Sequence, residues 1–355
     1  MDAVDYASDN STTMKKWRVV RFDLHVDPAF DETLRGDPRV DLHVAPVPRS
    51  DDDVTRALSG ADVYHVSSAR NEIARYAFVT PELVARCPSL LWVSTYGAGY
   101  DSVDVAACTR AGIAVMNQAG ANKVSVAEHT LALILAVAHR IAESDRRLRR
   151  DRTFTREDLM GHEIAGRTIG LVGIGHVGTE VARLARAFGL QVLAYDPLVA
   201  PEEIRRRGAE PVTFDHLLDR SDIVSLHCPR DDTTVGMMRA TQFERMKRGA
   251  LFITTARGGI HDEKALAHAL STGHLAGAGL DVWQPEPPPL EHPLLAMPNV
   301  VATYHTAGVT HEARHNIAVL GSEQVLQALS GERPPRLVNP EVWPAFRARF
   351  EQRVG

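Results

Sequence analysis

Residues that can carry chemistry follow short apolar runs at several places in this chain. They are Asp196, His227, Arg257, Asp281, Glu286 and His305. The runs have the composition of buried strands, and ligands bind beyond the carboxyl ends of strands in open α/β sheets. We therefore expect these side chains to gather at one edge of a parallel sheet.

Three of these residues fit the reduction of a ketone or the oxidation of an alcohol. The guanidinium of Arg257 stays charged and can bind a carboxylate with two hydrogen bonds. The imidazole of His305 can donate or accept a proton near neutral pH, and a carboxylate such as that of Glu286 favours the protonated ring. Spacing alone favours the simpler interpretation, in which Arg257 and Glu286 are solvated and His305 is structural.

A glycine-rich turn lies upstream, in the segment Gly173-Ile-Gly175-His176-Val177-Gly178. An apolar run precedes it, and apolar residues then recur every three or four positions up to residue 188, so the turn joins a strand to a helix. The first glycine permits the tight turn, the second lets a pyrophosphate approach the helix N-terminus, and the third lets the helix pack close to the sheet. The pattern predicts a dinucleotide-binding domain on a doubly wound, Rossmann-type sheet.

Asp196 ends the next predicted strand, 23 residues after Gly173. This is about the spacing expected of an acid that accepts hydrogen bonds from the adenosine ribose. Its carboxylate would repel a 2′-phosphate, and the segment 197–199 contains no cation. We therefore predict NAD rather than NADP.

Length and composition narrow the class of protein. The chain has 355 residues, of which 44% are apolar and 24% charged, as expected of a two-domain globular protein. A formal net charge of −5 argues against a nucleic-acid partner. The longest apolar run, 131–138, is too short for a membrane span. Three scattered cysteines without a CxxC pattern indicate a reducing, cytoplasmic location. They are Cys87, Cys108 and Cys228.

The first part of the chain alternates β and α patterns and predicts a small parallel α/β domain. Residues 1–16 are polar and are predicted to be a disordered extension, with Met14 as a possible second start. Strands are expected at 17–26, 61–66, 90–94 and 113–116, a short apolar stretch at 40–44, and helices at 53–58, 81–87 and 103–111. Ala98 and Gly99 follow a strand and offer backbone N–H groups to a carboxylate, although an ordinary turn explains them equally well. Arg70 has the same ambiguity, and a solvated surface arginine is favoured.

A single long helix is predicted at 124–147. It is apolar on all sides of its middle, which suggests an interface between domains or subunits. Beyond the glycine motif, strands are expected at 221–227, 250–254, 276–282 and 299–303, helices at 241–246, 262–271 and 312–329, and an ordered loop at 285–298.

His311 and His315 form an HExxH pattern, which on a helix can bind zinc. The sequence supplies no necessary third ligand, and a helix simply begins at this point. We therefore predict no metal site.

Several blocks together resemble the D-isomer-specific 2-hydroxyacid dehydrogenase family over roughly residues 60–330. The blocks are Gly97-Ala-Gly-Tyr-Asp101, Val126-Ala-Glu-His129, Leu226-His-Cys-Pro229, Thr254-Thr-Ala-Arg257-Gly, Asp281-Val-Trp-Gln-Pro-Glu286-Pro and Thr303-Tyr-His305-Thr-Ala-Gly308. The resemblance implies NAD-linked interconversion of D-2-hydroxy acids and 2-oxo acids. Tyr304 departs from the family, which usually has proline there, and Thr254 stands where asparagine is common.

The resemblance also implies roles for individual residues. Arg257 would bind the substrate, His305 would be the acid/base and Glu286 its partner. The backbone at Ala98 and Gly99 would hold the substrate carboxylate, and Asp281 would contact the nicotinamide carboxamide. The expected cofactor contacts are Gly173, Gly175, His176, Val177, Gly178, Asp196, His227, Cys228, Pro229, Thr234, Thr255, Ala256 and Asp281. Arg70, Trp283 and Tyr304 are candidates for selecting the acid.

The implied architecture has two domains with the substrate in the cleft between them. Residues 118–307 would form the NAD-binding domain, and residues 17–117 with 308–355 a smaller, flavodoxin-like substrate domain. Helix 124–147 would belong to a homodimer interface. Two other functions remain open: oxidation of phosphite by the same three groups, and an NAD-sensing corepressor-like interaction protein.

Overall fold

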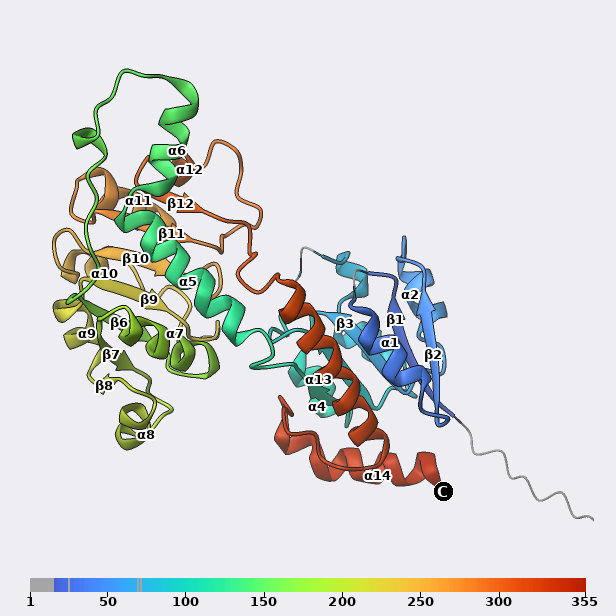
Figure 1. The fold of residues 1–355 in the computed structure, drawn as a ribbon. Coiled ribbons are helices and arrows are strands. Elements are labelled where there is room, and N and C mark those ends of the chain that lie inside the picture. Colours follow the sequence, from blue (N-terminus) through green and yellow to red (C-terminus); the bar gives the residue numbers. More distant parts are fainter. Residues whose placement is uncertain (1–15, 25, 69, 71) are drawn as a thin grey trace, which may run out of the picture. The chain divides into compact units, whose positions relative to one another are not determined.

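The computed structural model describes residues 16–24, 26–68, 70 and 72–355. The expected extension up to Lys16, with Met14, lies outside the described residues except for Lys16 itself, and so does His25 of the first expected strand. The described chain divides into two compact units, residues 16–119 with 315–355 and residues 120–314. Each unit is built around one parallel sheet (Figure 1). The prediction of a two-domain α/β fold is confirmed.

The first unit contains a five-stranded sheet in the order β2-β1-β3-β4-β5, with every neighbouring pair parallel. Its strands are β1 (Trp17–Phe22), β2 (Val40–Ala45), β3 (Val63–Ser67), β4 (Trp92–Tyr96) and β5 (Ala114–Met116). The alternation of side chains along a strand explains its two cores. Val20 and Tyr64 face one core, whereas Val19, Val63 and Trp92 face the other.

Helices cover both faces of this sheet. They are α1 (Pro28–Arg35), α2 (Asp51–Ala57), α3 (Pro81–Arg86) and α4 (Val105–Arg110), with a 3₁₀ turn η1 (Arg75–Ala77). Residues of α2, α3 and α4 share one core, and residues of α1 share the other with α13 (His311–Leu329). Helix α1 was not predicted, although Asp27 caps it by accepting a hydrogen bond from the backbone N–H of Ala29.

No helix or strand was predicted beyond residue 329, but the C-terminal segment is not a loop. It forms a 3₁₀ turn η3 (Pro340–Val342) and helix α14 (Trp343–Val354). Phe346 and Phe350 lie on one side of α14 and are buried, and Phe350 stacks on Trp17 with ring centroids 5.4 Å apart. Buried aromatic area of this kind fixes the helix against the sheet.

The second unit contains a seven-stranded sheet in the order β12-β11-β10-β9-β6-β7-β8, again entirely parallel. Its strands are β6 (Thr168–Val172), β7 (Gln191–Tyr195), β8 (Glu210–Pro211), β9 (Ile223–Leu226), β10 (Leu251–Thr254), β11 (Gly277–Leu280) and β12 (Val300–Ala302). Strand order reverses between β6 and β9. In doubly wound sheets this reversal marks the ligand-binding crevice.

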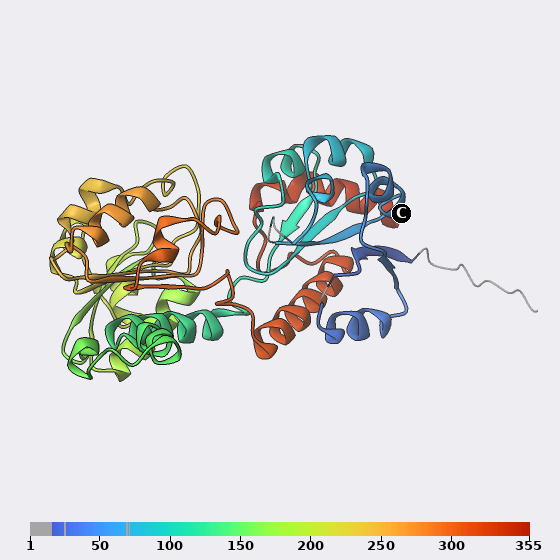
Figure 2. The ribbon, with the colours of Figure 1, turned by 90° about the horizontal axis from the view of Figure 1, so that it is seen from above.

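Two helical layers cover this sheet, and Figure 2 shows them on opposite faces. One core joins residues of α9 (Phe214–Arg220), α10 (Ala240–Arg245), α11 (Glu263–Ser271) and α12 (Pro293–Ala296). The other joins residues of α5 (Lys123–Ala138), α7 (His176–Ala187) and α8 (Pro201–Arg206). The expected ordered loop 285–298 contains the short α12, and α8, β8 and α9 were not predicted.

The prediction of a single helix at 124–147 is wrong, because two helices occupy this stretch. Helix α5 ends at Ala138, Arg140 adopts a left-handed conformation with φ of 54°, and α6 (Ile141–Arg150) continues at an angle of 59°. The carbonyl oxygen of Ala138 accepts a hydrogen bond of 2.8 Å from the backbone N–H of His162. This hydrogen bond satisfies a carbonyl group at the C-terminus of α5. The chain can therefore change direction after Ala138 without a proline or glycine there.

The two helices differ in burial. Leu131, Leu133 and Ile134 of α5 are buried, whereas no residue of α6 is. A 3₁₀ turn, η2 (Glu157–Leu159), follows α6. Among the described residues, no single helix has the length and apolar composition to cross a membrane; α5 and α6 pass that test only as a bent pair.

Candidate active site

The three glycines of the motif meet different surroundings at the carboxyl end of β6. Gly173 has φ of 94°, and a Cβ there would lie 2.8 Å from the backbone nitrogen of Cys228. A Cβ on Gly178 would lie 2.2 Å from the carbonyl oxygen of Gly173. A Cβ on Gly175, in contrast, would have no atom within 4 Å. The backbone at Gly175 therefore faces open space at the N-terminus of α7, where a phosphate can approach.

Asp196 is held against the glycine motif. Its Oδ2 accepts a hydrogen bond of 3.0 Å from the backbone N–H of Ile174, and its Oδ1 accepts one of 3.0 Å from that of Leu198. Arg207, which no sequence pattern indicated, donates from Nη1 to the carbonyl oxygen of Ile174 at 2.6 Å. Glu203 pairs with this guanidinium at 2.6 Å. The segment 197–199 lacks a cation, but the fold brings one from the end of α8.

His227 and Cys228 follow β9, whose last residue pairs with the last residue of β6. The Nε2 of His227 lies 2.9 Å from the hydroxyl of Ser225, and its Nδ1 is covered although the residue is partly exposed. Burial of the ring lowers the pKa of His227 to about 4, so the imidazole is neutral at pH 7. Burial also raises the pKa of Cys228 to about 11, which keeps it a thiol. Thr234 donates to the carbonyl oxygen of Pro229 at 2.7 Å.

The predicted contact between Glu286 and His305 is present. Nδ1 of His305 lies 2.6 Å from Oε1 of Glu286, with side-chain exposures of 31% and 17%. Oε2 of Glu286 accepts a hydrogen bond of 3.3 Å from the backbone N–H of Trp283. The carboxylate thus fixes the orientation of the imidazole through Nδ1, and Nε2 is the ring nitrogen left to serve a reacting oxygen.

Asp281 holds the loop that carries His305. Its carboxylate is fully buried and accepts hydrogen bonds from the hydroxyl of Thr303 at 2.6 Å and the backbone N–H groups of Thr306 and Ala307 at 2.9 and 3.0 Å. The backbone N–H of His305 donates to the carbonyl oxygen of Asp281 at 2.6 Å. His305 has φ of 49°, a conformation that surrounding contacts must enforce.

Arg257 lies on the loop after β10. This loop packs directly against the Glu286 loop, since a Cβ on Gly258 would lie 1.9 Å from the carbonyl oxygen of Trp283. Nη1 of Arg257 donates to the carbonyl oxygen of Ala256 at 2.7 Å. The indole of Trp283 is buried and donates from Nε1 to the carbonyl oxygen of Thr303 at 2.9 Å. The second unit thus brings the loops of Arg257, Glu286 and His305 together.

A residue that the sequence analysis gave no role also contacts this network. Nε2 of His129, on α5, lies 3.0 Å from the hydroxyl of Thr303 and 3.7 Å from Oδ1 of Asp281. The Val126–His129 block drew attention to this residue, but nothing in its spacing indicated a partner 174 positions away.

The predicted carboxylate-binding turn lies in the first unit. Gly97 has φ of 137°, and its carbonyl oxygen accepts a hydrogen bond of 2.8 Å from the backbone N–H of Gln118. Asn117 donates from its side chain to the carbonyl oxygen of Ala98 at 2.8 Å, and Gly99 is buried. These contacts fix the conformation of the turn at residues 97–99.

Two of the candidates for selecting the acid are exposed. Arg70 donates from Nε to the carbonyl oxygen of Asp101 at 2.6 Å, and 51% of Tyr304 is exposed. The histidines of the HExxH pattern lie on α13. Nδ1 of His315 is 3.3 Å from Oδ1 of Asp27, and within the described part of the chain no group of three or more His, Cys, Asp or Glu is placed to hold a metal ion.

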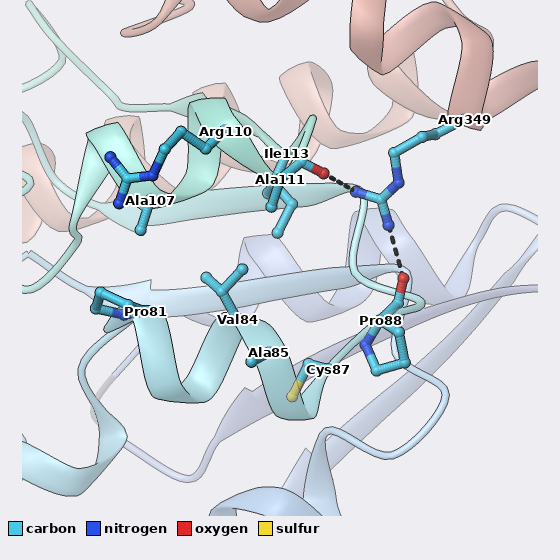
Figure 3. A pocket seen from close by; sticks show the side chains of 10 residues that line it. All are labelled: Pro81, Val84, Ala85, Cys87, Pro88, Ala107, Arg110, Ala111, Ile113 and Arg349. Atoms are coloured by element: carbon cyan, nitrogen blue, oxygen red, sulfur yellow. Dashed lines mark hydrogen bonds between the residues drawn. The ribbon is translucent and has the colours of Figure 1, made fainter.

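A pocket of about 510 Å³ lies elsewhere, in the first unit (Figure 3). Its walls come from α3 and α4, and Arg349 of α14 closes one end by donating to the carbonyl oxygens of Ala111 and Pro88 at 2.8 and 2.7 Å. None of the predicted site residues lines it.

Comparison with known proteins places this site in a family. The family model of the D-isomer specific 2-hydroxyacid dehydrogenase, NAD binding domain, matches residues 131–307. A glyoxylate reductase from Korarchaeum cryptofilum is 40% identical over 267 residues, which cover 74% of this chain and 80% of the relative. The crystal structure of a glyoxylate reductase from Paecilomyes thermophila superposes with a TM-score of 0.81 at 27% identity, covering 92% of this chain and 99% of that one.

A D-3-phosphoglycerate dehydrogenase from Archaeoglobus fulgidus is also 40% identical, over 268 residues that cover 75% of this chain. The match spans only about half, 51%, of that relative. The resemblance noted in the sequence is nevertheless confirmed by the family model and by the extent of the glyoxylate reductase match. The chain belongs to the D-isomer-specific 2-hydroxyacid dehydrogenase family.

Proposed function

We propose that this protein is an NAD-dependent oxidoreductase that interconverts a D-2-hydroxy acid and its 2-oxo acid. The observation that carries the proposal is the 2.6 Å contact between His305 and Glu286. The loop of Glu286 also packs against the loop of Arg257. An imidazole oriented by a carboxylate and a neighbouring guanidinium are the groups that the reduction of a 2-oxo acid needs.

The residues present fit NAD. The open space at Gly175 and the N-terminus of α7 suit a pyrophosphate. Each oxygen of Asp196 accepts one backbone hydrogen bond beside the motif and has a second lone pair that can accept from a ribose hydroxyl. When bound, this cofactor supplies or accepts the hydride. We propose that the sequence-predicted contacts around the carboxyl edge of the sheet, from Gly173 to Asp281, hold it.

Each catalytic side chain has one task in the proposed reaction. Arg257 binds the substrate and polarises its carbonyl group, because a guanidinium offers two parallel donors. His305 donates a proton from Nε2 to the carbonyl oxygen during reduction and accepts it during oxidation. Glu286 holds the ring through Nδ1 and stabilises the imidazolium. Backbone N–H groups at Ala98 and Gly99 are proposed to bind the substrate carboxylate.

We further propose a homodimer formed through α5 and α6. Helix α6 buries no residue within the chain, and Ile141 and Leu148 are each 55% exposed. Exposed apolar residues on one helix suit a protein partner. Three free cysteines, Cys87, Cys108 and Cys228, support a cytoplasmic location, where thiols stay reduced.

A panel of acids tests the function. NADH oxidation is followed by absorbance with glyoxylate, hydroxypyruvate and 3-phosphohydroxypyruvate, and NAD reduction is followed with phosphite. We expect turnover with at least one 2-oxo acid, and formation of the D product where the hydroxy acid is chiral. Absence of turnover with every 2-oxo acid, or turnover with phosphite alone, would contradict the proposal.

A further inference from the structure

Two adjacent residues of α5 contact the two loops that carry the proposed catalytic groups. Nε2 of His129 lies 3.0 Å from the hydroxyl of Thr303, two residues before His305. The hydroxyl of Thr130 lies 3.2 Å from the hydroxyl of Thr255, two residues before Arg257. One turn of α5 thus contacts both loops through side-chain hydrogen bonds.

The direction of the hydrogen bonds at Thr303 follows from its other partner. Its hydroxyl donates to Oδ1 of Asp281 at 2.6 Å, so the single hydroxyl proton is used there. Thr303 must then accept from His129, which requires a proton on Nε2. The chain of donors runs from His129 through Thr303 to Asp281, whose carboxylate also accepts the backbone N–H groups of Thr306 and Ala307.

The same argument applies to Thr130. Its hydroxyl donates to the carbonyl oxygen of Val126 at 2.8 Å within α5, so Thr255 donates to Thr130. Thr130 is fully buried and Thr255 is 7% exposed, so this bond forms away from water. A buried hydroxyl that loses its acceptor is destabilising, and relief of that cost favours a shift of the loop.

We propose that His129 and Thr130 are positioning residues, His129 for the acid/base loop of His305 and Thr130 for the substrate-binding loop of Arg257. This inference rests on the proposed function for its kinetic consequences. Neither residue touches a reacting atom in the proposed reaction. Each fixes a loop whose placement sets the geometry of proton transfer or of substrate binding, where a displacement of about 1 Å can cost roughly 100-fold in rate.

The two residues should affect different kinetic constants. Substitution His129→Ala should lower kcat roughly 10- to 100-fold, because it releases the loop of the proton donor. Substitution Thr130→Val, which keeps the side-chain shape, should mainly raise the KM for the 2-oxo acid. Substitution His129→Gln places an N–H donor at similar reach and should restore most of kcat.

Ser125 offers a matched control on the same helix. Its hydroxyl lies 2.8 Å from that of Thr310, which follows the His305 loop at the start of α13. Substitution Ser125→Ala removes a comparable hydrogen bond of α5 and should leave kcat and KM within about twofold. Equal losses in Ser125→Ala and His129→Ala, or a kcat of His129→Ala within about twofold of wild type, would overturn the proposal.

Hydrogen exchange separates this inference from the proposed function. Backbone N–H groups of residues 303–307 should exchange faster in His129→Ala than in Ser125→Ala or His129→Gln, whether or not any acid is turned over. If the wild type turns over no 2-oxo acid but the exchange pattern is as expected, the proposed function is rejected and the positioning role is kept. Unchanged exchange in His129→Ala would reject the positioning role while turnover of the wild type still supports the function.

Discussion

Oε1 of Glu286 lies 2.6 Å from Nδ1 of His305, although the two residues come from different loops. The backbone N–H of Trp283 fixes the carboxylate, and the carbonyl oxygen of Asp281 fixes the backbone of His305. The orientation of the His305 imidazole therefore depends on both loops and not on either one alone.

Substitution Glu286→Gln tests the contribution of the carboxylate. The amide can still contact Nδ1, but it carries no charge to stabilise the imidazolium. We expect kcat for 2-oxo acid reduction to fall about 100-fold or more, within the range of general acid–base catalysis, with little change in the Kd for NADH. Steady-state kinetics and fluorescence titration of NADH measure both quantities. A kcat close to that of wild type would show that Glu286 has no such role.

The glycine motif offers a matched pair of substitutions. Gly175→Ala adds a methyl group in open space, so the protein should fold normally and bind NADH more weakly. Gly178→Ala places its Cβ 2.2 Å from the carbonyl oxygen of Gly173, so the free energy of unfolding should fall by several kcal/mol, as for other severe overpacking. Thermal unfolding and NADH titration distinguish the two. Equal loss of stability in both variants would show that Gly175 and Gly178 do not have different roles in binding and packing.

Asp196 and Arg207 set the choice of cofactor in our account. Asp196→Ala removes the charge that would repel a 2′-phosphate, and Arg207 already contacts the same turn through Ile174. We expect the ratio of kcat/KM for NADPH to that for NADH to rise at least about tenfold. The double variant Asp196→Ala/Arg207→Ala should lose most of this gain. A wild-type protein that already prefers NADPH would contradict the assignment of Asp196.

Buried His261 predicts sensitivity to acid. The residue is 3% exposed, neither ring nitrogen has a hydrogen-bond partner among the described groups, and burial lowers the pKa to about 4. An unfolded histidine has a pKa of about 6.5, so between these values the unfolded chain binds more protons. The free energy of unfolding should therefore fall as pH decreases from 6.5 to 4, by at most about 1.4 kcal/mol per pH unit from this residue.

Substitution His261→Leu should reduce that dependence. Urea unfolding at pH 7 and pH 5 measures the loss, and exposed His216→Leu is the control that should lose as much as wild type. The same loss in His261→Leu as in wild type would show that this histidine does not carry the effect.

Much of the second unit was predictable because parallel strands buried on both faces appear as continuous apolar runs. Arg257, Asp281 and His305 each follow such a run, and the carboxyl ends of parallel strands meet at one edge. The prediction therefore needed only strand positions and not side-chain contacts.

Features that depend on partners far apart in the sequence were not predictable. The end of α5 at Ala138 depends on the backbone of His162, and no local residue marks it. The same holds for His129 and Thr303, and for Arg207 and Ile174. Helix α14 is different, because Trp343, Phe346 and Phe350 recur at helical spacing and could have indicated it.

The kcat of His305→Gln, measured beside its Kd for NADH, tests the central claim most directly. Glutamine removes the imidazole while keeping a polar side chain of similar size. We predict a fall in kcat of about 100- to 10,000-fold on the 2-oxo acid that the wild type reduces best, with NADH bound as in wild type. Unchanged turnover on every accepted acid would contradict the assignment of His305 as the proton donor.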